Sequence, residues 1–567
     1  MFTALPSTTR EFQHWSWSQI EPYYRELIAH HLDSSTLYLW LDSWSDLRRL
    51  VIETYNRLYV ATTQDTTDQD AERRYHTFLD QIYPVTQAAD YKLKEKLLSS
   101  SLQPEGFTIP LRNMRAEVDL FREANLPLLA EDLKLSADYD RLAGAQTVEW
   151  EGKEVTLPQL YPVYQNPDRV LRETAWRKAT ERQLTDRHRL DEMWVRYMGL
   201  RGKIAANAGR NDYRSYRWQQ LLRFDYTPQD CAAFHDAIEE VVVPVIQRLY
   251  EKRRKNLGLK ALRPWDLDVD PLGRPPLHPF NNLTELETKV SAMFQRVHPQ
   301  LAEYFEIMRR AGLLDLDNRK GKAPGGYCID FPVERHPFIF MNAIGVHEDV
   351  QTLLHEGGHA FHLFETRHLH YHHQLQNTME FAEVASMAME LLAAPYLPAR
   401  EGGFYSDVDA ARARLEHLEV ILRFWPYMSV VDSFQQWAYE NHLAASDPAN
   451  CDAKWAELWQ RFMVGVDWSG FEDIMMTGWQ RKLHIYQSPY YYIEYGLAEL
   501  GAIQIWANAL KDQSEAVSAY RKALSLGGTA TLPELYKTAG ARFSLDRTTL
   551  KEAVALVEET IDRLEQR

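Results

Sequence analysis

Cysteine is scarce in this chain of 567 residues. The three cysteines, Cys231, Cys328 and Cys451, lie far apart in the sequence. This spacing excludes a disulfide framework and a paired-cysteine metal site, and it is typical of a protein in a reducing compartment. We therefore expect a cytoplasmic protein.

Long hydrophobic runs are also missing. No apolar stretch approaches the roughly 18 residues that a membrane-spanning helix requires. The longest candidate, Val241–Ile246, is flanked by charged residues and is typical of a buried helix. The N-terminal sequence MFTALPSTTREFQHW has no cationic start followed by an apolar run, so we expect no signal peptide and no membrane association.

A surplus of positive charge is absent as well. The chain has 64 Lys and Arg against 80 Asp and Glu, a formal net charge of −16. Such a chain neutralises phosphates poorly, which argues against nucleic-acid binding. The 45% hydrophobic and 12% aromatic residues exclude a disordered chain and can fill a large core.

Helical periodicity runs through most of the sequence. Apolar residues recur at three- and four-residue spacing, and Gly and Pro fall mostly between these stretches. The polar, Asp- and Thr-rich segment Val60–Arg74 predicts a loop. The longest predicted helical stretches are residues 15–57, 168–207, 284–312, 407–444 and 513–526.

Three segments interrupt the helical pattern. Residues 147–157 alternate around a Glu151-Gly152 turn, which predicts a short hairpin. Residues 263–282 are rich in proline and cannot form a helix interior. Residues 325–342 have strand character, with a break near residues 332–337.

A possible metal site follows that strand directly. His355, Glu356 and His359 form the pattern H-E-x-x-H. On a helix, residues at i and i+4 share one face, so both imidazoles can reach one Zn²⁺ at about 2.0–2.1 Å. Glu356 lies beside the metal and is positioned to take a proton from a zinc-bound water.

Two glycines follow within the same predicted helix. Gly357 and Gly358 would each cost about 1 kcal/mol relative to Ala. That cost indicates a close approach to the helix backbone, and we expect the neighbouring strand to make it. The apolar residues before His355 predict that the helix is buried, where two histidines and a carboxylate need partners.

The third ligand must come from further along the chain. A metzincin pattern would require Gly at 362 and His at 365, but these positions are His362 and Glu365. Among Glu380, Glu383 and Glu390 on a predicted second helix, we choose Glu383 as the ligand. Glu390 shares a face with Glu383 and is a candidate to orient a zinc-bound histidine. The intervening histidines, His368, His370, His372 and His373, fit a polar, solvated loop better than a ligand set.

Three ordered blocks, supported by a fourth further along the chain, give the sequence a family likeness. GGYCIDFPVERHPFIFMN, HEGGHAFH and FAEVASMAMELL, followed by HIYQSPYYYIEYGLA from His484, resemble the thimet oligopeptidase and oligoendopeptidase F family of zinc peptidases. The bacterial oligoendopeptidase F branch is the most similar, over roughly residues 200–550. Gly357 departs from the family pattern, in which a bulky apolar residue is usual.

The resemblance implies site residues and their roles. It implies His355, His359 and Glu383 as ligands of one zinc ion and Glu356 as general base. It also implies that Tyr495, with Tyr492 and His484 as further candidates, faces the developing oxyanion, which neutral donors at about 2.7–3.1 Å can stabilise. Tyr490 is more typical of a packing residue.

The resemblance also implies a fold. It is mainly α, with two helical lobes around a deep substrate channel and a small β-sheet beside the zinc-binding helix. We expect residues 1–200 to form an N-terminal helical lobe containing the hairpin, and residues 201–567 to form the catalytic lobe. The strand at 337–342 would be an edge strand that pairs with an extended peptide.

The resulting hypothesis is a zinc-dependent oligoendopeptidase that cuts short, unstructured peptides. One alternative is a peptidyl-dipeptidase of a related helical zinc class, which would need a cationic pocket for the substrate carboxylate; Arg335 and Lys482 are candidates for it. The other alternative is an inactive peptide-binding protein. The sequence leaves the oligomeric state open.

Overall fold

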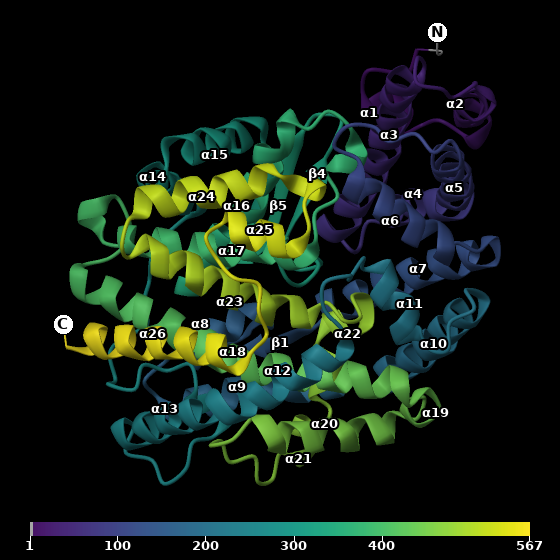
Figure 1. Ribbon diagram of the computed structural model, residues 1–567. Coiled ribbons are helices and arrows are strands. Elements are labelled where there is room, and N and C mark those ends of the chain that lie inside the picture. The colour runs from purple at the N-terminus through teal and green to yellow at the C-terminus, as the bar shows by residue number, and fades with distance from the viewer. Residues whose placement is uncertain (1–3, 567) are drawn as a thin grey trace.

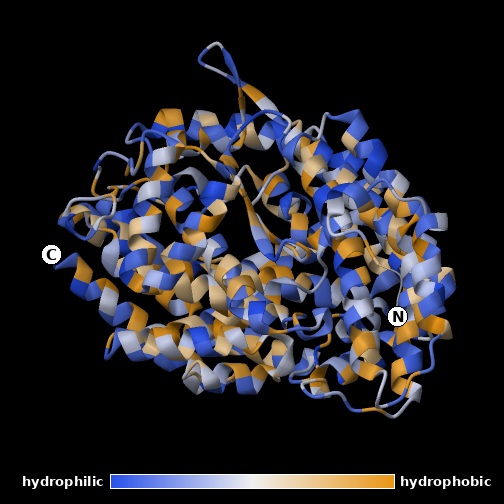
Figure 2. Ribbon diagram, turned by 90° about the horizontal axis from the view of Figure 1, so that it is seen from above, coloured by the Kyte–Doolittle hydropathy of each residue, from blue (hydrophilic) through white to orange (hydrophobic). Residues whose placement is uncertain are grey.

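The computed structural model describes residues 4–566. Within this range the chain forms 26 α-helices, several short 3₁₀ turns and five strands, so the prediction of a mainly α fold is confirmed. Figure 1 shows the helices surrounding a small sheet. Figure 2 shows hydrophilic and hydrophobic residues alternating along the outer helices. None of the helices between residues 4 and 566 has the length and apolar character required to cross a membrane.

The first helices form a group with its own hydrophobic core, which includes the fully buried Trp40 and Trp44. In Figure 1 this group is purple and blue, at the upper right. Its helices are α1 (Thr9–Phe12), α2 (Trp17–Ala29), α3 (Leu37–Gln64), α4 (Gln69–Gln81), α5 (Tyr83–Ser99) and α6 (Thr108–Leu120). Helix α7 (Leu126–Gly144) follows and packs Leu135, Tyr139 and Leu142 into the main core of the protein.

The loop predicted for Val60–Arg74 is wrong in its length. Helix α3 continues to Gln64 because Val60 and Thr63 are buried against the rest of the protein. Helix α4 then begins at Gln69, since the Asp68 side chain accepts hydrogen bonds from the backbone N–H groups of residues 70 and 71. Only residues 65–68 connect the two helices.

The helices of the middle of the chain include the predicted stretches at 168–207 and 284–312. The apolar run Val241–Ile246 lies at the junction of two consecutive helices, with Val242 fully buried, as expected. These helices are α8 (Tyr161–Tyr164), α9 (Arg169–Leu184), α10 (Arg187–Asn207), α11 (Tyr213–Gln220), α12 (Pro228–Val241), α13 (Val243–Asn256), α14 (Leu283–Val297) and α15 (Pro299–Ala311).

The remaining helices follow the sheet and include the predicted stretches at 407–444 and 513–526. They are α16 (His347–Glu365), α17 (Met379–Ala393), α18 (Asp407–Glu440), α19 (His442–Ala445), α20 (Pro448–Phe462), α21 (Glu472–Met476), α22 (Leu483–Gln487), α23 (Tyr492–Ala509), α24 (Gln513–Ser525), α25 (Leu532–Thr538) and α26 (Arg547–Glu565).

The strands form two small sheets. The predicted hairpin is confirmed as β1 (Thr147–Trp150) and β2 (Lys153–Thr156), with positive φ angles at both turn residues. The second sheet has the order β3-β5-β4, with β3 (Leu314–Asp317) parallel and β4 (Tyr327–Phe331) antiparallel to β5 (His336–Ala343).

The expectation of an edge strand at 337–342 is therefore wrong. That segment is part of β5, the central strand, and it is hydrogen-bonded on both sides. Cys328 of β4 pairs with Ile339 of β5, which leaves β4 as the edge strand nearest the predicted metal helix. Residues 338–341 of β5 are buried, as is usual for a central strand.

Helix α3 braces the edge strand β4 from the N-terminal helical group. The Asn56 side chain donates to the Asp330 carbonyl at 2.7 Å, and the hydroxyls of Thr63 and Tyr327 are 2.6 Å apart. Glu53 accepts from the backbone N–H of Val333 at 2.6 Å. These bonds satisfy edge groups that would otherwise lack partners.

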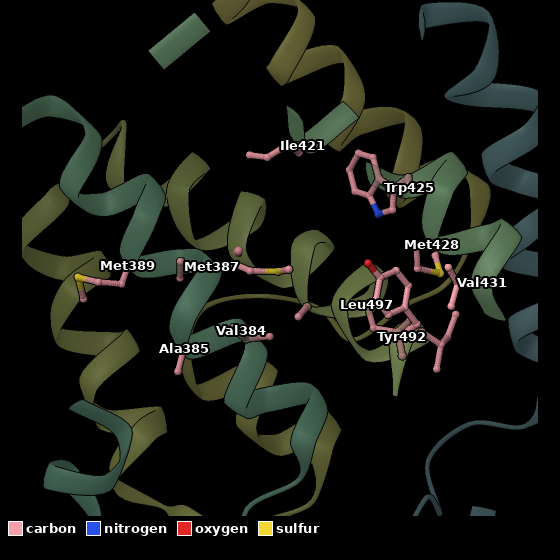
Figure 3. Packing of buried hydrophobic residues seen from close by; sticks show 14 of the residues in the cluster. Val384, Ala385, Met387, Met389, Ile421, Trp425, Met428, Val431, Tyr492 and Leu497 are labelled. Carbon is pink, nitrogen blue, oxygen red and sulfur yellow. The ribbon is translucent and has the colours of Figure 1, made fainter. Parts of the chain in front are cut away.

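The core is formed by α16, α17, α18 and α23. Figure 3 shows Val384 and Met387 of α17 near Leu497 of α23, with Trp425 and Met428 of α18 on the other side. The glycines of α16 permit its close packing. A Cβ at position 358 would lie 2.5 Å from the Ala385 carbonyl oxygen and the Ser386 Cα of α17, and one at 357 would lie 2.6 Å from Phe294 of α14.

These contacts change one expectation. The close approach predicted for Gly357 and Gly358 exists, but helices α17 and α14 make it rather than the neighbouring strand. The backbone of α17 cannot move aside for a Cβ at position 358 as easily as the end of a flexible side chain could. The spacing between α16 and α17 therefore depends on Gly358.

We expect Gly358→Ala to lower the free energy of unfolding by about 1–3 kcal/mol, since the added methyl group forces two helices apart. Thermal unfolding monitored by circular dichroism measures this as a lower Tm. Gly199→Ala is the matched control, because Gly199 lies in α10 and a Cβ at that position would meet no neighbouring group of the described residues within 4 Å. That control should be neutral or stabilising; equal Tm values for both variants would contradict the close-packing argument.

Candidate metal centre and cavity

Helix α16, which carries His355 and His359, is capped at its N-terminus. Asp349 caps the helix by accepting hydrogen bonds from the backbone N–H groups of Ile344, Gly345 and Val346 at 2.7–2.9 Å. Val350, Leu353 and Leu354 are fully buried on the apolar face. The half-buried His355 and His359 therefore project together from the remaining face.

His355, His359 and Glu383 come together at one point. Each offers a ligand atom within 4.8 Å of the others. Glu383 Oε2 lies 3.2 Å from His355 Nε2 and 3.5 Å from His359 Nε2. Two imidazole nitrogens and one carboxylate oxygen are a donor set suited to a divalent metal ion, zinc in particular.

A second carboxylate orients His355 from behind. Glu390 Oε1 lies 2.7 Å from His355 Nδ1, and Glu390 Oε2 lies 2.8 Å from His417 Nε2. Burial alone would raise the pKa of Glu390, but the two histidines outweigh it and lower that pKa to about 2. The resulting carboxylate leaves His355 Nε2 directed toward Glu383, the arrangement that we expected for Glu390.

Glu356 lies beside this cluster, and no described residue donates a hydrogen bond to its carboxylate. Its side chain is buried, and Oε2 has no hydrogen-bond partner among the described residues. Burial raises its pKa. A Cβ on Gly326 would lie 3.3 Å from Glu356 Oε1, so the start of β4 passes close to this carboxylate.

The other acids near the motif point elsewhere. Glu380 accepts a hydrogen bond from Tyr226 at 2.6 Å and lies 3.3 Å from Arg223. Glu365 accepts from Arg521 at 2.7 Å. Each carboxylate therefore already has a partner of its own.

The prediction of a solvated histidine loop at 368–373 is only partly right. His368 and His370 are exposed. His373 is buried, with its ring centroid 4.0 Å from that of Trp44, and burial lowers its pKa well below the usual range. The loop rests on the N-terminal group of helices, where aromatic side chains cover it.

The predicted tyrosine block approaches the metal cluster from α22 and α23. Tyr495 Oη lies 3.3 Å from His484 Nε2. The ring centroid of Tyr492 is 5.1 Å from that of His484 and 5.4 Å from that of Tyr495. Burial lowers the pKa of His484 to about 3, so this imidazole is neutral near pH 7. Tyr490 is fully buried and donates to the Gln435 carbonyl, as expected for a packing residue.

Tyr491 is a site residue that the sequence analysis did not assign. Its hydroxyl donates a short hydrogen bond to Glu383 Oε1, the oxygen that does not face the histidines. The sequence spacing is consistent with this position, because Tyr491 and Tyr495 are four residues apart and therefore share a helix face. Tyr491 thus orients Glu383 much as Glu390 orients His355.

A cavity of about 640 Å³ opens beside the cluster. Tyr492 and Tyr495 line it, whereas Arg335 does not; the exposed Arg335 instead donates to the Arg367 carbonyl at 2.7 Å. The proposal of Arg335 as part of a cationic pocket is therefore unsupported. The other lining residues include Gly326, Glu348, His355, Glu356, Lys482 and His484.

Comparison with known proteins agrees with this arrangement. The model of peptidase family M3 matches residues 163–554, and that of the peptidase M3 N-terminal domain matches residues 8–106. Oligopeptidase PepF of Bacillus subtilis (strain 168) is 25% identical over 335 residues, covering 57% of this chain and 47% of that relative. The match therefore spans about half the length of PepF.

Two solved structures are similar over nearly the whole chain. The structure of PZ peptidase A with inhibitor 2 has a TM-score of 0.90 and 26% identity, covering 99% of this chain and 98% of that one. An X-ray structure described as a candidate oligoendopeptidase F has a TM-score of 0.92 and 27% identity, with 98% of both chains covered.

We expect Glu383→Ala to abolish tight metal binding and Glu380→Ala to leave it nearly unchanged, because only Glu383 faces both histidines. Titration of the metal-free protein with Zn²⁺ measures both affinities. The two residues lie on the same helix, so each variant controls for the other. A larger loss of affinity in Glu380→Ala would overturn the choice of Glu383.

Proposed function

This chain belongs to peptidase family M3, and from that premise we propose that it is a zinc-dependent oligoendopeptidase that cleaves internal bonds of short, unstructured peptides. The observation that carries the proposal is the convergence of His355, His359 and Glu383 beside the unpartnered Glu356 oxygen. The cavity next to them supplies room for a peptide. We also propose a cytoplasmic location, which the three free thiols support.

One zinc ion per chain would be held by His355, His359 and Glu383. When bound, zinc supplies a Lewis acid that polarises a peptide carbonyl and lowers the pKa of water. The residues fit this role: two imidazole nitrogens and one carboxylate oxygen offer three donors, and a catalytic zinc site keeps its remaining position open. Glu390 and Tyr491 hold the donors in place through their hydrogen bonds.

Glu356 acts as the general base. Its Oε2 atom has no partner among the described residues, so it can accept the proton of an attacking water. The same oxygen can then deliver that proton to the leaving amine. The surroundings of Glu356 raise its pKa, which makes it a better proton carrier near neutral pH than an exposed glutamate.

Tyr495 donates a hydrogen bond to the oxyanion that develops on the scissile carbonyl. Its hydroxyl lines the cavity and touches only the neutral His484 among the described hydrogen-bonding side chains. Burial raises the pKa of Tyr495 well above its usual range, so the phenol keeps its proton. Tyr492 and His484 are the other candidates for this role, and their ring packing sets the orientation of Tyr495.

The substrate backbone would pair with β4 rather than with β5. Gly326, at the start of β4, lines the cavity close to Glu356. Because Asn56 occupies the Asp330 carbonyl, pairing is confined to the half of the strand nearest Gly326. A deep channel between an N-terminal lobe of residues 1–200 and a catalytic lobe of residues 201–567 would exclude folded proteins.

The function is tested with the zinc-loaded protein, short unstructured peptides and a folded protein. We expect internal cleavage of the peptides and no cleavage of the folded protein, with products identified by mass spectrometry. In Glu356→Gln, zinc content and peptide binding should persist, while kcat falls by about 10²–10⁴-fold because the base is lost.

Glu365→Gln is the matched control, since Glu365 lies on the same helix and pairs with Arg521 away from the cluster. It should retain the wild-type kcat. Failure of the wild-type protein to cut any peptide would support the inactive peptide-binding alternative instead.

We expect Tyr495→Phe to lower kcat by about 10²–10³-fold with little change in KM, because one oxyanion donor is removed. Steady-state kinetics with one defined peptide measure the split between kcat and KM. Tyr490→Phe is the control, since Tyr490 is buried away from the cavity. A silent Tyr495→Phe together with an inactive Tyr492→Phe would move the role to Tyr492.

A further inference from the structure

Lys482 places a positive charge in the cavity without a counterion. It lines the cavity just before α22, and its Nζ lies 4.7 Å from the Tyr492 ring centroid and 5.6 Å from that of Tyr427. Among the described residues, no carboxylate oxygen comes within 4.0 Å of this ammonium group. The two aromatic faces are its closest favourable contacts.

Other enclosed lysines in this protein do not resemble it. Lys94 is 2.9 Å from Asp90, and Lys322 is 2.9 Å from Asp315. A cation removed from water without a partner is costly, which is why such groups are normally paired. Burial lowers the pKa of Lys482 to about 8, and Glu348 opposes that shift only from a distance. The ammonium group therefore stays mainly protonated at pH 7 while lacking an ion-pair partner.

The neighbouring acidic residues do not form an ion pair with Lys482. Glu348 of α16, its nearest acidic influence, shares a hydrogen bond with Tyr161. On α18, Glu419 pairs with Arg253 at 3.6 Å, and Arg423 faces Glu419 and Asp268. Glu419 has a cation of its own and Glu348 is hydrogen-bonded to a tyrosine, and neither forms an ion pair with Lys482. A carboxylate that enters the cavity would therefore find Lys482 available.

Lys482 lies near the residues that are proposed to act on the scissile bond. Tyr492 is a neighbour of both Lys482 and Tyr495: its ring centroid lies 4.7 Å from Lys482 Nζ and 5.4 Å from the ring centroid of Tyr495. His484, two residues beyond Lys482, contacts Tyr495. A group bound by Lys482 would thus lie in the same cavity as the proposed oxyanion donor, with Tyr492 as their common neighbour.

We propose that Lys482 binds a carboxylate of the peptide substrate and makes the enzyme favour peptides that carry an acidic group a short distance from the scissile bond. This inference rests on the proposed peptidase function and adds a substrate preference to it. The carboxylate has two possible sources, the C-terminus of the peptide and an acidic side chain. A C-terminal source would direct cleavage toward the end of the peptide, as in a peptidyl-dipeptidase.

The test uses two matched peptide pairs with the zinc-loaded protein. One pair differs only in a free or amidated C-terminus, and the other only in Glu or Gln near the cleaved bond. Since a charge-assisted hydrogen bond is worth more than a neutral one, we expect the acidic member of one pair to have a kcat/KM about tenfold higher or more. The pair that shows the preference identifies the source.

Lys482→Met should reduce that acidic-to-neutral ratio to about one, and Lys482→Arg should retain most of it. Lys511→Met is the control, because Lys511 is exposed and does not line the cavity. Zinc content and Tm verify that each variant is folded. Equal rates within both pairs in the wild type, or an unchanged ratio in Lys482→Met, would overturn the proposal. A wild-type protein that cuts neither pair would instead overturn the peptidase function itself.

Discussion

The close packing of α16 on α17 is the constraint on which the site depends. The two histidines of the proposed metal site come from one helix and the carboxylate from the other, so the distance between the helices sets the distance between the donors. Gly358 permits that distance because its missing side chain is replaced by the backbone of Ala385 and Ser386. Glycine destabilises the helix relative to alanine, but only its missing side chain permits this close spacing of α16 and α17.

The parts of the site that follow from local spacing could be predicted from the sequence. The i, i+4 rule brings His355 and His359 together, and the heptad spacing of Glu383 and Glu390 puts both on the face toward α16. The helical stretches and the hairpin at Glu151-Gly152 follow from equally local periodicity and turn chemistry. The likeness of three ordered blocks then linked these segments to one family of folds.

The parts that depend on tertiary contacts could not be predicted in the same way. The burial of Val60 extends α3 through a polar segment, and Trp44 covers His373 in a segment that is polar by composition. The order of strands in the sheet, which makes β4 the edge, is not encoded in the pattern of either strand alone. The contact of the Tyr491 hydroxyl with Glu383 likewise joins two segments far apart in the sequence, and neither segment encodes it alone.

The bracing of β4 by α3 ties together two parts of the chain that are far apart in the sequence. Asn56 and Thr63 lie on an N-terminal helix, whereas Asp330 and Tyr327 belong to a strand more than two hundred positions later. An N-terminal segment exchanged from a distant homologue would bring a different surface against that strand. We therefore expect substitutions on the two sides of this contact to have coupled rather than additive effects on stability.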